Sequence, residues 1–471
     1  MGGGILQLLV SGVQDVILSG NPEITFFKKV YKRYTNFGIE QMEQVFIGEK
    51  AFGKRIRCKI DFKGDLLKDI YLMIKLSDTL GISQQITNSD SYHQYYKNIF
   101  KVGFSIIDYV ELTIGGQVID KHYGEWLDIW TQLTYSYEKY EMLMSLIKNK
   151  KHHFSNLNFR NSEHYQQDFI NNEYIYVPLL FWFNTEPGLA LPLIAIQYHE
   201  VVLNVKFKEL NQIKILNEVK TTVYHDLFDN TPTDDDNIPF FKVDDSTNKS
   251  NRKWKSNNYN GVIEDVICYC DYIFLDTDER KMFANNSHEY LITQVQRTNI
   301  LDMPSLTYEI PMAETDFSFE FNHPIKEIVW TIQNKLTQGL PIYKNLDLSH
   351  IGVEFTMMAN NIEMIKKREA EYFSLIQPYQ NHTCGGLIQQ NVNRYYNGGF
   401  YMYSFCLNSE SSQPTGTLNF SKLDNFVLKL KYKKSSIELT HINENYCFTA
   451  YAINYNILKI SNGMAGMVYS N

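Results

Sequence analysis

The chain has 471 residues, of which 44% are hydrophobic and 21% charged, and its formal net charge is −8. This length can bury more than one core, so two or more domains are expected. The acidic balance and the lack of a long basic tract argue against a protein that wraps nucleic acid directly, because phosphate neutralisation needs a basic face.

The composition is rich in aromatic residues, with 33 Tyr and 29 Phe. Tyr and Phe favour strands, although an AT-rich genome would give the same richness. The six cysteines are too sparse for a disulfide scaffold, which indicates a reducing environment during folding. Cys268 and Cys270 would share one face of a strand as small packed side chains, and no second pair completes a zinc site.

An apolar segment opens the chain at residues 4–18 (GILQLLVSGVQDVIL), with apolar residues at roughly helical spacing. Residues 20–22 (GNP) then interrupt it. We assign residues 1–25 to an N-terminal arm, which either folds back on its own domain or docks on another protein. We expect no signal peptide, because the first cation is Lys28, and no membrane span.

An internal duplication is the main evidence for the fold. Four short blocks recur in the same order: residues 67–74 (LKDIYLMI) and 325–332 (IKEIVWTI), 110–113 (VELT) and 353–356 (VEFT), 201–207 (VVLNVKF) and 426–432 (FVLKLKY), 272–275 (YIFL) and 455–458 (YNIL). Each match alone is weak, but their shared order favours a duplicated unit. The first copy carries the longer connections.

The duplicated unit is predicted to be a β-sandwich. Its blocks have strand length, mix β-branched and aromatic residues, and are bounded by turn signals such as Gly115-Gly116 and Pro187-Gly188. We therefore predict an all-β fold: a tandem double jelly roll of two eight-stranded sandwiches with helical and loop insertions. The first jelly roll is placed at residues 26–283 and the second at 284–471.

Helices are expected only as insertions at matching places in the two copies. After the VELT block, apolar and aromatic residues recur at helical spacing: Trp126, Ile129, Trp130, Leu133, Tyr137, Tyr140, Met144 and Ile147. A shorter candidate helix, rich in Glu and Lys, is predicted at residues 361–376 in the second copy. Ordinary packing on a sheet explains both.

A long acidic loop is predicted at about residues 212–260, which include TPTDDDNIPFFKVDDSTNKS. It lacks the glycine and terminal glutamate of a calcium loop, so a solvated loop is expected. Asn248 in this loop, Asn285 and Asn381 are candidate N-glycosylation sites, since each stands in an Asn-x-Ser/Thr pattern. Asn419 also does, and is the poorest candidate.

Catalytic chemistry has no motif in this chain: there is no phosphate loop, dinucleotide fingerprint, His-Glu-x-x-His or nucleophile elbow. His122, His199, Glu200 and His288 are a scattered set that ordinary hydrogen bonding explains better than catalysis. We predict a protein that is not an enzyme and takes no cofactor and no metal.

Longer segments resemble a known family. They include residues 20–37 (GNPEITFFKKVYKRYTNF), 115–126 (GGQVIDKHYGEW), 187–203 (PGLALPLIAIQYHEVVL), 271–284 (DYIFLDTDERKMFA), 321–330 (FNHPIKEIVW), 413–425 (QPTGTLNFSKLDN) and 454–471 (NYNILKISNGMAGMVYSN). Over nearly its whole length the chain resembles the double jelly-roll major capsid proteins of nucleocytoplasmic large DNA viruses, of the chlorovirus and mimivirus type. The segment at 212–260 departs from the family by its length and acidity.

The resemblance implies a homotrimeric, pseudo-hexagonal capsomer that tiles the icosahedral outer shell of a virion assembled in the host cytoplasm. It implies further copies of the chain, minor capsid proteins and a penton protein as partners. Contact with an internal membrane would be indirect, and none with nucleic acid is expected. The apolar segment at residues 187–196 is either a trimer-facing loop or a buried connection of the first jelly roll.

Two other classes of protein fit a β-sandwich sequence. One is a protein that binds or cleaves carbohydrate, which would need exposed aromatics in a cleft or a pair of carboxylates. The other is a minor capsid or spike protein present in few copies. The mass of the chain in solution separates these classes, because a tight trimer supports the capsomer.

Overall fold

In the computed structural model the chain divides into two compact units, Met1–Phe37 and Gly38–Asn471. The structure describes residues 5, 19, 21–76, 81–88, 91–98, 101–147, 174–213, 262–302, 312–334, 353–384, 387–391, 394–397, 400–433 and 446–469. In the first unit, residues 21–36 run without helix or strand apart from a turn at 26–28. The helix predicted at residues 4–18 lies almost wholly outside the described residues.

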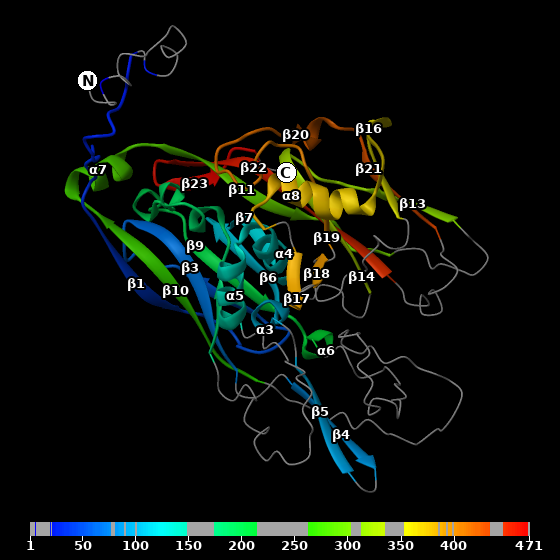
Figure 1. Cartoon of the computed structure of the whole chain (residues 1–471). Coiled ribbons are helices and arrows are strands. Elements are labelled where there is room, and N and C mark those ends of the chain that lie inside the picture. The colour runs from blue at the N-terminus through cyan, green and yellow to red at the C-terminus, as the bar shows by residue number, and fades with distance from the viewer. Residues whose placement is uncertain are drawn as a thin grey trace. The chain divides into compact units, whose positions relative to one another are not determined.

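The second unit contains two β-sandwiches, each of two four-stranded sheets (Figure 1). The sheets of the first sandwich have the orders β1-β10-β3-β8 and β2-β9-β6-β7. Their strands are β1 (Phe37–Val45), β2 (Arg55–Lys59), β3 (Leu66–Leu76), β6 (Ile107–Ile114), β7 (Gln117–Tyr123), β8 (Tyr174–Pro178), β9 (Val201–Phe207) and β10 (Ile263–Leu275).

The second sandwich has the sheet orders β11-β22-β14-β19 and β13-β21-β15-β16. Its strands are β11 (His288–Arg297), β13 (Met312–Ser318), β14 (Pro324–Asn334), β15 (Glu354–Ala359), β16 (Ile362–Glu369), β19 (Phe400–Ser404), β21 (Phe426–Lys433) and β22 (Tyr446–Ser461). Three short strands extend the first of these sheets: β12 (Leu301–Asp302), β20 (Leu418–Asn419) and β23 (Met464–Met467).

Both sandwiches have the same topology. When the eight strands of each are counted along the chain, the sheets run 1-8-3-6 and 2-7-4-5 in both copies. This is the jelly-roll arrangement, so the predicted double jelly roll of eight-stranded sandwiches is confirmed. The four repeated blocks lie on the third, fourth, seventh and eighth strands of both copies.

A shared irregularity supports the duplication. On the third strand of each copy one extra residue, Lys68 in β3 and Lys326 in β14, bulges where the strand pairs with the eighth. Pairing also refines the repeat: Leu67 pairs with Tyr272 and Ile325 with Asn454. The YIFL and YNIL blocks therefore lie on equivalent strands, but one residue out of register.

The insertions are short helices and hairpins. In the first sandwich they are α3 (Val102–Ser105), α4 (Gly124–Thr134), α5 (Tyr137–Leu146), η3 (Trp182–Asn184), η4 (Pro187–Leu189), η5 (Leu193–Ala195), α6 (Leu210–Ile213) and the hairpin β4 (Gly81–Asn88) with β5 (Ser91–Asn98). Helix α7 (Thr277–Asn285) precedes the second sandwich, which contains η9 (Tyr372–Ile376), α8 (Gln377–Asn381), η10 (Phe420–Lys422) and the hairpin β17 (Leu387–Asn391) with β18 (Arg394–Asn397).

The helical series after VELT is confirmed as α4 and α5, but the helix predicted at residues 361–376 is wrong in its first half. Residues 362–369 form strand β16, and the helical segments η9 and α8 follow it. Asn360 and Asn361 both have positive φ, which suits the tight turn of a hairpin. The Glu and Lys residues were misinterpreted, because an exposed edge strand is also rich in charge.

Each sandwich has its own hydrophobic core, but the core of the first sandwich also includes side chains from the second half of the chain. Alternation on β10 puts Val266, Cys268 and Cys270 inside. The core of the first sandwich also includes four residues from β11, β22 and β23: Ile292, Leu458, Ile460 and Ala465. The second core holds stacked rings such as Phe317 and Phe448, whose centroids are 4.0 Å apart.

Most of the segment at residues 187–196 is a buried connection of the first sandwich, while Pro187 and Gly188 at its start are exposed. Leu191, Leu193 and Ile196 lie in the core of that sandwich, and the backbone N–H of Leu67 donates to the carbonyl of Leu191 at 2.9 Å. Most of the acidic loop at 212–260 lies outside the described residues. None of the helices described here is long and apolar enough to cross a membrane.

Candidate assembly site at the junction of the two sandwiches

Helix α4 starts directly after β7, the fifth strand of the first sandwich, and its first residue must be small. A Cβ atom on Gly124 would lie 2.2 Å from the carbonyl oxygen of Phe104 and 2.5 Å from that of Ile107. Because both neighbours are backbone atoms, no side chain can move aside. Glycine therefore lets the helix start against α3 and β6.

The apolar face of α4 packs on the second sandwich. Trp126, Ile129 and Leu133 are buried in one cluster with five residues of the outer face of sheet β11-β22-β14-β19: Val329, Phe400, Met402, Tyr451 and Ile453. The rings of Trp126 and Tyr451 have centroids 5.3 Å apart. Burial of such large side chains is the main source of stability at an interface. We call this set the internal junction.

A buried carboxylate closes one end of the internal junction. Glu125 accepts hydrogen bonds from the hydroxyl of Tyr451 at 2.7 Å, the amide of Gln333 at 2.7 Å and the hydroxyl of Thr331 at 3.2 Å. Burial raises the pKa of Glu125, and the hydroxyls of Tyr451 and Thr331, together with the nearby cations Lys208 and Arg297, oppose the shift. Burial also lowers the pKa of the neighbouring Lys208 to about 8. Three donors from the second sandwich thus fix the start of α4.

The opposite side of α4 is fixed to the first sandwich. Lys101 is buried, and its ammonium donates to both carboxylate oxygens of Asp128, at 2.6 and 2.7 Å. Burial lowers the pKa of Lys101, while Asp128 opposes the shift. Gln132 donates to the same carboxylate at 2.8 Å. A buried ion pair with good geometry specifies the position of the helix more than it stabilises the fold.

Strand edges complete the internal junction, where β7 of the first sandwich meets β11 of the second. The backbone N–H of Val295 donates to Asp120 at 3.0 Å, and the amide of Gln294 donates to the carbonyl of Ile119. The guanidinium of Arg297 lies over the ring of Tyr123, 3.7 Å from its centroid. The junction therefore joins the fifth strand of one sandwich to the first strand of the other.

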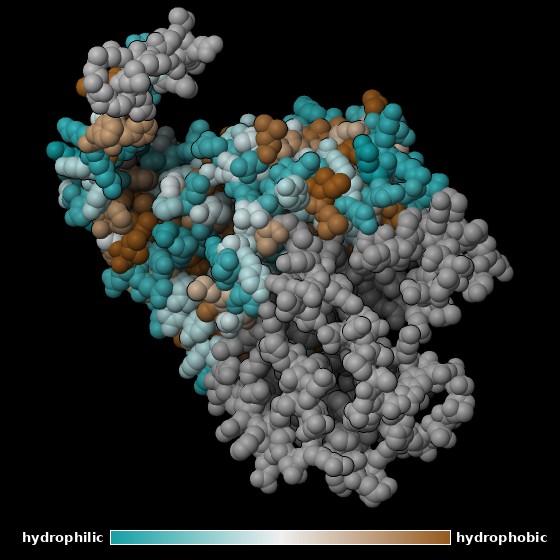
Figure 2. Space-filling view, viewed as in Figure 1, coloured by the Kyte–Doolittle hydropathy of each residue, from teal (hydrophilic) through white to brown (hydrophobic). Residues whose placement is uncertain are grey.

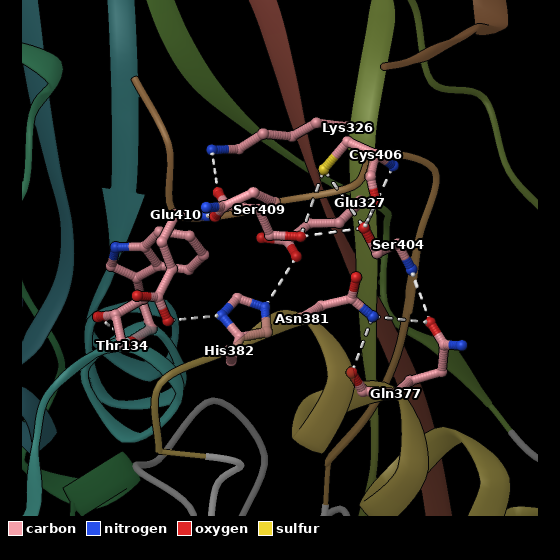
Figure 3. Close-up of polar contacts among 12 residues, drawn as sticks. Thr134, Lys326, Glu327, Gln377, Asn381, His382, Ser404, Cys406, Ser409 and Glu410 are labelled. Atoms are coloured by element: carbon pink, nitrogen blue, oxygen red, sulfur yellow. Dashed lines mark hydrogen bonds and ion pairs between the residues drawn. The ribbon is translucent and has the colours of Figure 1, made fainter. Parts of the chain in front are cut away.

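A second polar cluster lies where α8 ends beside β14 (Figure 3). The ring of His382 is fully buried and lies 2.9 Å from a carboxylate oxygen of Glu327 and 3.2 Å from one of Glu410. Burial alone would lower the pKa of His382, but the two carboxylates outweigh burial and raise it to about 9. Glu410 also accepts from the hydroxyl of Thr383 at 2.6 Å.

This cluster also touches the first sandwich. The ring of Trp130 on α4 lies edge-on to His382 with centroids 5.8 Å apart, and the backbone N–H of Cys384 donates to the carbonyl of Leu133 at 3.0 Å. Lys326, the bulged residue of β14, donates to the carbonyl of Ser409 at 2.7 Å. Nothing in the amino-acid sequence marks this cluster, because its members share no spacing that is typical of a site.

The scattered polar residues considered for catalysis are not brought together. His122 bonds Asp120 at 2.8 Å, His199 the carbonyl of Ala465 at 2.9 Å, and His288 the carbonyl of Phe283 at 2.8 Å, while Glu200 pairs with Lys59 at 2.6 Å. Each thus has its own local partner. In the part of the chain that the structure describes, no group of three His, Cys, Asp or Glu side chains is placed to hold a metal ion.

The candidate glycosylation sites differ in their surroundings. Asn248 lies outside the described residues. Asn285 is exposed at the end of α7. Asn381 is half-buried, and its amide nitrogen donates to the backbone and side chain of Gln377, at 2.9 and 3.4 Å. A glycan needs an accessible amide nitrogen, so the geometry favours Asn285 of these two.

Two jelly rolls in tandem, joined through a buried junction, define a double jelly-roll protein of the kind that forms viral coats. A model described as "Major capsid protein N-terminus" matches residues 25–276, and one described as "Large eukaryotic DNA virus major capsid protein" matches residues 279–466. The chain belongs to the family of major capsid proteins of large eukaryotic DNA viruses. It is a structural protein of the virus capsid.

Relatives of similar length support this assignment. The major capsid proteins of Pyramimonas orientalis virus and of Paramecium bursaria Chlorella virus 1 are each 33% identical, with both chains covered completely. A quasi-atomic model of the PBCV-1 virus capsid matches with a TM-score of 0.67 and 29% identity, over 95% of this chain and 100% of that one. The Faustovirus major capsid protein shares the fold, with a TM-score of 0.62 at 13% identity over 96% and 94%.

Proposed function

We propose that the chain assembles as a homotrimer, a pseudo-hexagonal capsomer that tiles the icosahedral shell of a large DNA virus. The observation that carries the proposal is the identical 1-8-3-6 and 2-7-4-5 strand order of both sandwiches. Three copies would present six sandwiches of one topology, and such a ring tiles a flat face. Ring closure by a repeated head-to-tail contact is a common form of cyclic symmetry.

The experiment is a mass measurement of the purified chain by size-exclusion chromatography with light scattering. A stable species of three times 55.2 kDa supports the capsomer. A monomer that binds glycans would instead support the carbohydrate-binding alternative. A monomer at every concentration up to the micromolar range, without glycan binding, would overturn self-assembly as the property of this chain alone.

We further propose that the chain consists of three segments: an arm at residues 1–25, a first jelly roll at 26–283 and a second jelly roll at 284–471. Partners beyond further copies are minor capsid proteins and a penton protein, with the internal membrane contacted only indirectly and nucleic acid not at all. The protein acts in the outer shell, after assembly in the host cytoplasm. Cross-linking of purified virions followed by mass spectrometry tests these contacts, and a cross-link to the genome would contradict them.

Catalysis forms no part of the proposal. The buried polar groups near the junction, Glu125 and His382, are used by contacts within the chain: Glu125 by three donors and His382 by two carboxylates. A catalytic acid or base must be reachable by a substrate. Glycoside hydrolysis assays on the trimer should give rates equal to those without protein.

A further inference from the structure

Each of the two surfaces that meet at the internal junction has an equivalent surface on the other sandwich, and these two equivalent surfaces are complementary to each other. The internal junction joins the fifth strand of the first sandwich, with the helix that follows it, to sheet β11-β22-β14-β19 of the second. The equivalent elements are β16 with η9 and α8 on the second sandwich, and sheet β1-β10-β3-β8 on the first. Figure 1 shows β16 and β1 far apart, at opposite edges of the unit.

The helical surface repeats the spacing of α4. Trp126, Ile129, Trp130 and Leu133 stand 3, 6, 7 and 10 residues after Tyr123, the last residue of β7. Tyr372, Leu375, Ile376 and Tyr379 stand at the same separations after Glu369, the last residue of β16. All eight residues are large and apolar or aromatic. We call the second set, with β16, the donor face.

The donor face is exposed where α4 is buried. Tyr379 is 85% exposed, Ile376 46% and Leu375 40%, whereas Ile129 and Leu133 are fully buried. The helix itself is held in place, because Phe373 lies in the core of the second sandwich and Gln377 donates to the hydroxyl of Tyr372 at 2.9 Å. Figure 2 shows hydrophobic surface over this helical segment. A fixed element with exposed large side chains marks an interaction site.

The accepting surface also repeats residue by residue. Val329 pairs with Tyr451 across β14 and β22, and the same register pairs Tyr71 with Tyr269 across β3 and β10. Thr331 pairs with Phe400 on β19, as Met73 pairs with Tyr176 on β8. Three of the five residues that receive α4, Val329, Phe400 and Tyr451, thus correspond to tyrosines of the first sandwich. The other two, Met402 and Ile453, correspond to Pro178 and Asp271, so the equivalent surface of the first sandwich is more polar.

These tyrosines form an aromatic patch on the outer face of the sheet. The rings of Tyr71 and Tyr269 stack with centroids 5.0 Å apart, and Tyr176 lies 6.2 Å from Tyr71. All three are partly exposed, and Ile39 on the neighbouring edge strand β1 is 52% exposed. Tyrosine is enriched at the centres of protein interfaces. We call this patch, with β1, the acceptor face.

Charge on the two edge strands is complementary as well. β16 (IEMIKKRE) carries three exposed cations and two exposed glutamates, a net charge of 3 − 2 = +1, whereas the two charged residues of β1 are Glu40 and Glu43, a net charge of −2. Unlike charges at the rim of an interface contribute little affinity but orient the partners and speed their encounter. Two donor faces would place like charges together, so the charges favour head-to-tail contact.

We propose that the donor face of one copy docks on the acceptor face of a second copy, so that the contact between chains repeats the internal junction. The proposal rests on the proposed trimer and names the surfaces that form it. A head-to-tail contact that copies an intrachain contact gives a ring of alternating sandwiches when the repeated rotation completes a full turn after six sandwiches, and an open filament when it does not. Tyr379 and Leu375 would contact Tyr71, Tyr269 and Tyr176 of the next chain.

The test uses one charge substitution on each face: Tyr379→Arg on the donor face and Tyr71→Arg on the acceptor face. Each should weaken self-association by about 100-fold or more, because a charge is buried against aromatic rings at the centre of the interface. Leu407→Arg and Met142→Arg are matched controls, since these residues are 86% and 72% exposed but lie on neither face. Light scattering should find monomers for the first pair and trimers for the controls.

Mixing the two variants gives a sharper result. The Tyr379→Arg chain keeps an intact acceptor face and the Tyr71→Arg chain an intact donor face, so a mixture should form one-to-one dimers that cannot close. Circular dichroism melting checks that each variant folds, and Leu375→Arg and Ile39→Lys replace any that does not. If the wild type is a trimer and folded variants on both faces remain trimers, the docking is wrong while the trimer stands. If the wild type is a monomer, both proposals fail.

Discussion

Equivalent sheets of the two sandwiches differ in one respect: the outer face of one is covered within the chain, and the outer face of the other is exposed. In the second sandwich, Val329 and Tyr451 are covered by α4 of the same chain. In the first sandwich, their counterparts Tyr71 and Tyr269 are partly exposed and keep polar partners, Gln41 and Glu43, at their hydroxyls. A surface completed within the chain can rely on buried apolar groups. A surface that is exposed in the free chain and buried in a complex needs side chains that suit water and an apolar interface, and tyrosine suits both through its hydroxyl and its ring.

The strongest way to break this comparison is to separate the sandwiches. A chain ending at residue 283 would lack Ile292, Leu458, Ile460 and Ala465, which complete the core of the first sandwich. We expect it to lose cooperative folding, because large apolar side chains of the first core would be exposed to water. Differential scanning calorimetry of this fragment beside the full chain checks this. A sharp, reversible transition of the fragment would show that the sandwiches are independent.

A pair of matched truncations compares a covered helix position with an open one. Ile129→Ala should lower the free energy of unfolding by about 3 to 4 kcal/mol, since Ile129 is fully buried at the internal junction. Leu375→Ala stands at the same separation from its strand and should cost below about 1 kcal/mol in a monomer. Urea unfolding of both variants in the Tyr379→Arg background checks the difference. Equal costs would contradict the assignment of the donor face as open.

We expect the cluster around His382 to make the stability of the second sandwich depend on pH. Because the folded-state pKa of about 9 lies above the ordinary value of 6.5, the folded chain holds the proton more tightly. The stabilisation is complete below about pH 6.5 and is lost as the pH rises through about 9. It amounts to about 3 kcal/mol by the conversion of 1.36 kcal/mol per pKa unit.

The measurement is the free energy of unfolding of wild type and His382→Gln between pH 6 and pH 10. The gap between the two proteins should be largest at pH 6 and close near pH 10. The difference isolates His382 from Lys208, whose lowered pKa of about 8 acts in the opposite direction as the pH rises. A gap that does not change with pH would remove the ion pairs of His382 as a source of stability.

The sequence alone was enough for the fold but not for the contacts between its parts. Ordered repeats placed four strands of each copy correctly, because the buried strands of a duplicated core keep similar apolar patterns. Strand β16 was missed, because Ile365 is the one buried residue of this exposed edge strand, so its sequence shows no alternation of apolar and polar residues. The apolar series after VELT predicted α4, yet it carried no sign of which sheet the helix covers.

The candidate assembly site was harder to predict for a related reason. Glu125 meets Thr331, Gln333 and Tyr451, and His382 meets Glu327 and Glu410. These partners come together only through the topology, at separations in the chain that no short motif records. The sequence offers one comparison between the copies, the spacing of large apolar residues after the fifth strand. That comparison requires knowing that β16 is the fifth strand of the second copy.

The smallest expected effect gives the closest comparison, because it removes one hydroxyl from each of two equivalent tyrosines. Tyr451→Phe should destabilise the chain by about 2 kcal/mol, since the hydroxyl donates to the fully buried Glu125 at 2.7 Å and the carboxylate would lose one of three donors. Tyr269→Phe removes a bond of 2.9 Å to the exposed Glu43, where water can replace it, and should cost below about 0.5 kcal/mol. Thermal unfolding of the two variants side by side measures the difference. If the two costs are equal, the covered and open sheets do not differ in the way that the internal junction requires.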